Sequence, residues 1–98
     1  MDVYFTLHGV TFAWDARKAG DNLRKHGVSF EEACEAFFDP FVRPADAGRH
    51  DEERLAFLGM TEGGRLLFVV YTGLEDDVFR IISARRATRQ ERRAYESP

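Results

Sequence analysis

Arginine side chains in the second half of the chain carry its most distinctive chemistry. Arg65, Arg80 and Arg85 lie in or beside segments rich in β-branched and aromatic residues, which are typical of strands. A guanidinium group presents a planar fork of donors that binds phosphate through two hydrogen bonds, which a lysine cannot do. Such groups can stabilise the charge that develops when a hydroxyl attacks a phosphodiester, so all three are catalytic candidates. A solvated surface arginine is the alternative for each.

Strand periodicity predicts which side chains accompany these arginines. If the strand over residues 80–85 is unbroken, Ser83 and Arg85 lie on one face and Arg80 lies on the other. Ser83 is therefore a further catalytic candidate. His26 is another, because an imidazole exchanges protons near neutral pH. The alternative role for His26 is to cap a helix C-terminus, where a cation interacts favourably with the helix dipole.

Charge is distributed unevenly along the chain. Residues 1–79 hold 8 Lys or Arg against 15 Asp or Glu, a net charge of −7, whereas residues 80–98 hold 6 Arg against 2 Glu, a net charge of +4. An anionic partner is therefore expected at the C-terminal end. The residues predicted to bind a nucleic-acid backbone, there and on the first predicted helix, are Lys18, Lys25, Arg86, Arg89 and Arg92.

The sequence does not indicate a metal or cofactor site. Cys34 is the only cysteine, which excludes an intramolecular disulfide and Cys-rich zinc sites, and we interpret it as a small core residue rather than a reactive thiol. The run from His50 to Glu53 could bind a cation, but no second ligand cluster lies elsewhere, so we interpret it as a solvated loop. No metal and no cofactor are expected.

Capping signals predict three helices. The first begins at the N-cap Asp15 and ends near His26 before a glycine, and its inward face is expected to hold Ala16, Ala19 and Leu23. The second begins with a capping box at Ser29 and ends before residue 40, and its apolar face is Phe30, Ala33, Cys34, Phe37 and Phe38. A basic C-terminal helix follows the N-cap Thr88.

Strands are predicted over 54–59, 65–72 and 78–84, with turns too short for a parallel crossover, so they should form an antiparallel meander. Residues 1–11 are expected to add a strand or hairpin, and 39–51 to form a loop. The predicted fold is therefore one α+β domain over 1–98, with helices on one face of an antiparallel sheet of about four strands. The absence of a long apolar run or a leader indicates no membrane association and a cytoplasmic location.

Several motifs together resemble the BrnT family of toxins. The matching segments, in the order in which the family has them, are Phe12–Asp15, Asn22–Ala33, Phe38–Pro40, Gly64–Leu67, Val69–Thr72 and Arg80–Ala87. The resemblance implies a RelE-like α+β fold and a metal-independent ribonuclease that inhibits translation. It also implies a cognate BrnA-type ribbon-helix-helix antitoxin, a heterotetramer formed with it, and DNA contact only through that complex.

The sequence departs from the family pattern after Thr72. The family has an arginine shortly after this Tyr-Thr pair and another at the end of the Ile-Ser-Ala-Arg strand, and only the second is present, as Arg85. Leu74 and three acidic residues occupy the other corner, which should weaken phosphate binding there. The alternative function is therefore a catalytically weakened BrnT-like protein that acts as an antitoxin-binding module. DNA recognition by this chain alone is disfavoured by its net charge of −3.

Overall fold

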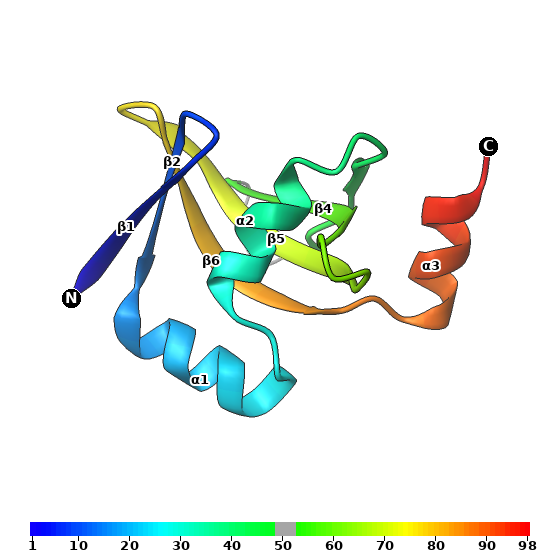
Figure 1. The fold of residues 1–98 in the computed structure, drawn as a ribbon, viewed down its shortest axis with the longest axis horizontal. Coiled ribbons are helices and arrows are strands. Elements are labelled where there is room, and N and C mark those ends of the chain that lie inside the picture. Colours follow the sequence, from blue (N-terminus) through cyan, green and yellow to red (C-terminus); the bar gives the residue numbers. More distant parts are fainter. Residues whose placement is uncertain (49–52) are drawn as a thin grey trace.

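Residues 1–48 and 53–98, which the computed structural model describes, form six strands and three helices (Figure 1). Of Leu74 and Glu75 it describes the backbone alone. In chain order the elements are β1 (Asp2–Leu7), β2 (Val10–Asp15), α1 (Ala16–His26), α2 (Phe30–Phe37), β3 (Arg43–Ala45), β4 (Arg54–Met60), β5 (Leu66–Glu75), β6 (Val78–Arg86) and α3 (Arg89–Glu96). None of the helices in these residues has the length and apolar character needed to cross a membrane.

The sheet corrects the predicted topology. Its strand order is β1-β2-β6-β5-β4-β3, and the meander β4-β5-β6 is antiparallel as predicted. The expectation of about four strands, all antiparallel, is wrong. Residues 2–15 form a hairpin, the predicted loop after the second helix contains β3, and β2 pairs with β6 in parallel. The parallel contact joins segments from opposite ends of the chain, so no turn between them could reveal it.

Helices α1 and α2 cover one face of the sheet and enclose the core. The largest fully buried side chains include Phe12 of β2, Phe30 of α2 and Leu67 of β5. Helix α2 approaches β4 so closely that a Cβ added to Gly59 would lie 2.3 Å from the carbonyl oxygen of Ala36. The glycine therefore lets the helix pack directly on the strand, because any side chain there would overlap backbone.

The three helices begin at the predicted capping residues, and α1 ends at the predicted glycine. Asp15 caps α1 by accepting from the Lys18 N–H, and Gly27 closes it in the left-handed region with φ 68°. Capping boxes begin α2 at Ser29 and α3 at Thr88, as predicted. These signals are local, because each cap satisfies backbone donors within its own first turn.

The arrangement of α3 differs from that of the other two helices. It has no buried residue and stands apart from α1 and α2 in Figure 1. It contacts β4, side chains of the sheet face opposite α1 and α2, and Asp39, which follows α2. The prediction that the helices share one face therefore holds only for the first two. We call this opposite face, on which Arg80 and Arg85 lie, the open face.

Candidate active site

A bulge in β6 brings the candidate residues of that strand onto the open face. Val70 pairs with Ser83 and Tyr71 pairs with Ile81, so Ile82 is an extra residue between them. Ile81 and Ala84 both point into the core, and Arg80, Ser83 and Arg85 therefore point away from it. The unbroken alternation, which separates Arg80 from Ser83 and Arg85, is wrong for this reason.

The strand register places the two arginines in separate transverse rows of the open face. The row of Arg80 consists of Tyr4, Ala13, Arg80, Thr72 and Arg54. The row of Arg85 consists of Arg85, Phe68, Leu58 and Arg43. Ser83 lies in the row between them. At a rise of about 3.3 Å per residue, the outer rows are about 13 Å apart, a gap that two long arginine side chains can largely bridge.

Arg80 is held by a carboxylate from β1. Its two terminal nitrogens donate to the two oxygens of Asp2 at 3.2 and 2.8 Å. This hydrogen bonding lowers the pKa of Asp2 and raises that of Arg80, so the pair stays ionised. The Arg80 and Asp2 side chains are 39% and 41% exposed, so water screens the pair and a phosphate can reach the remaining guanidinium donors.

Arg85 is fixed more tightly, between an aromatic ring and α3. Its guanidinium carbon lies 4.4 Å from the centre of the Phe68 ring. Its terminal nitrogens donate to the two oxygens of Glu91 at 2.8 and 2.9 Å. The hydrogen bond with Arg85 lowers the pKa of Glu91, and the same bond raises the pKa of Arg85. The arrangement gives a permanently charged guanidinium that is held in one orientation.

Arg65 lies away from this pair and ties the two N-terminal helices to the sheet. It donates to the Glu32 carboxylate at 2.8 Å and to the Gly27 carbonyl oxygen at 3.1 Å. Glu32 is also the capping-box residue of α2, so Arg65 joins the end of α1 to the start of α2. The structure therefore does not bring Arg65 together with Arg80 and Arg85.

The remaining predicted residues lie on two helices and a strand end. His26 is half-buried in the last turn of α1, which packs against the core side of the sheet. The predicted backbone-binding residues are all exposed: Lys18, Lys25, Arg86, Arg89 and Arg92. Arg92 lies 3.7 Å from Glu96 in an ion pair along α3, so its charge is partly compensated.

Asn22 positions the end of β6 that carries Ser83 and Arg85, and the sequence pattern did not predict this role. The side chain is 8% exposed and donates to the carbonyl oxygens of Val28 at 3.0 Å and Ala84 at 2.8 Å, while it accepts from the Ala84 N–H at 3.1 Å. Ala84 lies between Ser83 and Arg85, so α1 clamps the backbone that carries both. Leu23, predicted to point inward, is instead 51% exposed. The sequence offered one signal for Asn22, since it is a polar residue inside the segment Asn22–Ala33 that carries the family resemblance.

Asp39 anchors the C-terminal helix. Its side chain accepts from the Tyr95 hydroxyl, from the Met60 N–H at 2.7 Å and from the Phe41 N–H at 2.9 Å. Burial raises the pKa of Asp39, but these three hydrogen bonds outweigh it and the net shift is downward. Burial and the bond to Asp39 raise the pKa of Tyr95 to about 12. Helix α3 is thus held by polar contacts rather than by a core.

The corner at Leu74 differs from the predicted turn. Strand β5 continues through Gly73 to Glu75, with one extra residue relative to β6, and the turn itself is only Asp76 and Asp77. Both have positive φ, 57° and 61°, which a two-residue hairpin turn requires and which aspartate tolerates. Two exposed carboxylates therefore follow the row of Arg80.

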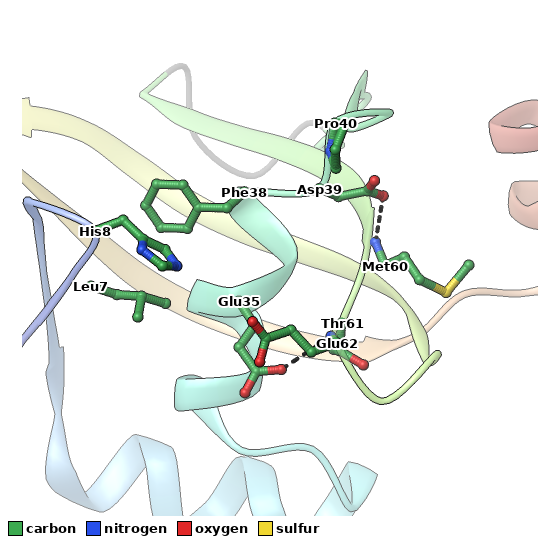
Figure 2. A pocket seen from close by; sticks show the side chains of 9 residues that line it. All are labelled: Leu7, His8, Glu35, Phe38, Asp39, Pro40, Met60, Thr61 and Glu62. Atoms are coloured by element: carbon green, nitrogen blue, oxygen red, sulfur yellow. Dashed lines mark hydrogen bonds between the residues drawn. The ribbon is translucent and has the colours of Figure 1, made fainter.

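A cavity of about 350 Å³ at the end of α2 does not contain these arginines (Figure 2). Its polar lining includes His8, Glu35 and Glu62, and the Glu35 carboxylate accepts from the Glu62 N–H at 3.3 Å. Among the described residues, no group of three or more His, Cys, Asp or Glu is placed to hold a metal ion, and His50–Glu52 lies outside them. Cys34 is fully buried, and burial raises its pKa to about 12, as suits a core residue.

Comparisons with known proteins agree on one family. The family model described as the ribonuclease toxin BrnT of a type II toxin–antitoxin system matches residues 14–91. No curated protein matches the chain. Among solved structures, the fold is similar to the crystal structure of the Brucella abortus ribonuclease toxin BrnT, with a TM-score of 0.56 and 23% sequence identity. The match covers 78% of this chain and 94% of that one.

Proposed function

Since this chain belongs to the BrnT family of ribonuclease toxins of type II toxin–antitoxin systems, we propose that it is an endoribonuclease that cleaves RNA without metal and thereby inhibits translation. In the proposed reaction the 2′-hydroxyl passes its proton to water and its oxygen attacks the adjacent phosphorus. The bond from phosphorus to the 5′-oxygen breaks, and that oxygen takes up a proton from water. The negative charge on the phosphate increases on the way, so fixed cations accelerate the step.

One observation carries the proposal: Arg80, Ser83 and Arg85 share the open face, and Arg85 is fixed in orientation by Phe68 and Glu91. Arg85 stabilises the developing charge, because a preoriented guanidinium needs little rearrangement when the charge forms. Glu91 acts as a positioning residue through Arg85. Arg80 binds the adjacent backbone, and Ser83 lies between them. His26 lies on α1, on the other side of the sheet from the open face, so we propose no step for it in this reaction, and Arg65 supports the fold.

Substitution of Arg85 tests this assignment. Arg85→Ala should lower kcat/KM for RNA by about 10²–10³-fold, by analogy with the loss of one preorganised donor. Arg85→Lys should restore little of it, because an ammonium cannot form the two-bond fork. Arg93→Ala is the matched control, since Arg93 is an exposed cation on α3. Circular dichroism and thermal unfolding would confirm that each variant is folded. A folded Arg85→Ala protein with unchanged cleavage would overturn the role of Arg85.

Metal independence is tested on the same protein. Cleavage of single-stranded RNA should be unchanged after dialysis against EDTA, because the proposed charge stabilisation comes from guanidinium groups. Loss of cleavage in EDTA with recovery on addition of Mg²⁺ would refute a metal-free mechanism.

Family membership implies an antitoxin partner. We propose that it is a BrnA-type ribbon-helix-helix protein, that the two chains form a heterotetramer, and that DNA is bound only through this complex. Co-expression with the adjacent gene product, followed by mass measurement in solution, tests the stoichiometry. DNA binding by the isolated chain at physiological salt would contradict the last point.

A specific observation favours a second candidate function, the catalytically weakened antitoxin-binding module. Arg80 and Arg85 already bind carboxylates, and Asp76 and Asp77 add negative charge near the row of Arg80. Replacement of residues 73–77 by a shorter neutral turn with one arginine should then raise cleavage at least tenfold, about 1.4 kcal/mol in the barrier. Equal rates would mean that the present arginines suffice. Cleavage by neither protein would favour the binding module.

A further inference from the structure

The open face has a second feature beside the arginines, an exposed aromatic ring above a small pocket. Tyr4 of β1 is 66% exposed, and it lies in the transverse row that continues through Ala13 to Arg80. The cavity has a volume of about 300 Å³. The residues that line it are Tyr4, Ala13, Thr72, Gly73, Asp76, Val78 and Arg80.

The shape and composition of this pocket suit a flat, partly polar group. Ala13 is 1% exposed and forms a low floor beside the ring, so a planar ligand can lie along the strand surface next to Tyr4. An exposed aromatic side chain on a sheet is the usual platform on which an unpaired nucleobase stacks, since every base has a π-face. The polar groups around the rim, on Thr72 and Asp76, can bond to base edges.

The charges around the pocket favour a base over a phosphate. Of the described residues that line the cavity, only Arg80 is a cation, and Asp2 compensates it through two hydrogen bonds. Asp76, also in the lining, is exposed and adds a negative charge. A phosphate inside the pocket would lie beside the Asp76 carboxylate, which repels it, whereas a neutral base would not be repelled. A phosphate bound to the exposed donors of Arg80 therefore lies outside the pocket.

We propose that the Tyr4 pocket binds one unpaired nucleobase of the RNA, stacked on the Tyr4 ring. The proposal rests on the proposed function, because it takes RNA as the substrate. The rows of Arg80 and Arg85 are about 13 Å apart at the usual strand rise, so the stacked base belongs to a nucleotide that flanks the bond cut at Arg85. Tyr4 precedes residue 14, where the family match begins, so this pocket would give the chain a substrate preference of its own.

Binding of two uncleavable probes tests the pocket directly. The first is a single-stranded oligonucleotide of mixed sequence with 2′-O-methyl groups, which block the attacking hydroxyl. The second has the same backbone without bases. Fluorescence anisotropy with the full chain should give an affinity for the first probe that falls about 5- to 150-fold in Tyr4→Ala, which corresponds to about 1–3 kcal/mol of stacking. Affinity for the abasic probe should not change.

Two variants make the result specific to the ring in the pocket. Tyr4→Phe should keep most of the affinity, because it retains the aromatic face. Phe41→Ala is the matched control, since Phe41 is another exposed aromatic residue, 74% exposed, and does not line this pocket. Tyr4→Ala binding that equals the wild type, or an equal loss for the abasic probe, would overturn the proposal. Because Tyr4 is exposed, its replacement should leave thermal unfolding unchanged.

Cleavage of ordinary RNA, measured separately, distinguishes this proposal from the proposed function. Tyr4-dependent binding of the methylated probe by a chain that cuts no RNA would support the pocket and contradict the ribonuclease. Cleavage by a chain whose probe binding does not depend on Tyr4 would contradict the pocket alone.

Discussion

Removal of the Asn22 side chain should destabilise the fold strongly, because this polar side chain is buried between α1 and the sheet. Asn22→Ala takes away two donors and one acceptor that bind the backbone of Val28 and Ala84. The backbone groups of Ala84 then lose their partner at a place where β2 no longer runs beside β6, because the β2–β6 pairing ends at Arg80. The change therefore leaves polar groups unpaired at a buried edge.

The expected loss can be worked from the number of bonds. Three intramolecular hydrogen bonds at about 1 kcal/mol each give about 3 kcal/mol in the free energy of unfolding. In a domain of this size each kcal/mol shifts Tm by about 4–8 °C, so Tm should fall by about 12–24 °C. That is a large part of the stability of a typical small domain, about 5–15 kcal/mol.

Thermal and urea unfolding, followed by circular dichroism, measure this loss. Leu23→Ala is the control, because Leu23 is the next residue, is half exposed, and is the one that hydrophobic periodicity turns inward. It should cost less than about 1 kcal/mol. If Leu23→Ala cost more than Asn22→Ala, or if Asn22→Ala cost less than about 1 kcal/mol, the clamp would have no energetic importance and the reasoning would be wrong.

Three further predictions concern packing and the attachment of α3. Gly59→Ala should destabilise the fold by about 1–3 kcal/mol in urea unfolding, because the new Cβ would overlap the Ala36 carbonyl, and an unchanged midpoint would show that α2 can move. Tyr95→Phe should increase hydrogen exchange in α3 while leaving β5 unchanged, because only α3 loses an anchor. The lowered pKa of Asp39 and Glu91 makes the attachment of α3 stable above the usual carboxyl range, about pH 4, and weaker as the pH falls through the lowered values. Exchange in α3 that does not rise with acid would contradict this.

The sequence predicts the elements whose signals are local. Asp15, Ser29 and Thr88 cap their helices because a cap depends on the next three residues, and the antiparallel meander follows from short turns. The parallel contact of β2 with β6 depends on residues far apart in the chain, so it could not be predicted. Helix α1 directs Asn22 rather than Leu23 toward the sheet, although its hydrophobic pattern predicts that Leu23 points inward. The reason is that three hydrogen bonds to the backbone outweigh the burial of one leucine.

The candidate site was predictable in residue type but not in grouping. Ser83 and Arg85 share a face as expected, since the bulge lies before both of them. Arg80 joins them only because of that bulge, which alternation cannot reveal. The carboxylate partners Asp2 and Glu91 depend on tertiary distances; Glu91 was visible only as a capping residue. Tyr4 had a signal, an aromatic residue at an outward position of a predicted strand, but nothing in the sequence linked it to Arg80.

The bulge at Ile82 has a consequence for how the length of this strand can vary. Arg80 and Arg85 are an odd number of residues apart, and the bulge absorbs the surplus one. Deletion of Ile82 would leave a regular strand in which both arginines still face the same way, and Ile81 and Ala84 would still face the core. Deletion of any other single residue between the arginines would remove the bulge only if Ile82 moved into a paired position of the strand. Ile82 is therefore the position at which a relative could be one residue shorter and keep the same face.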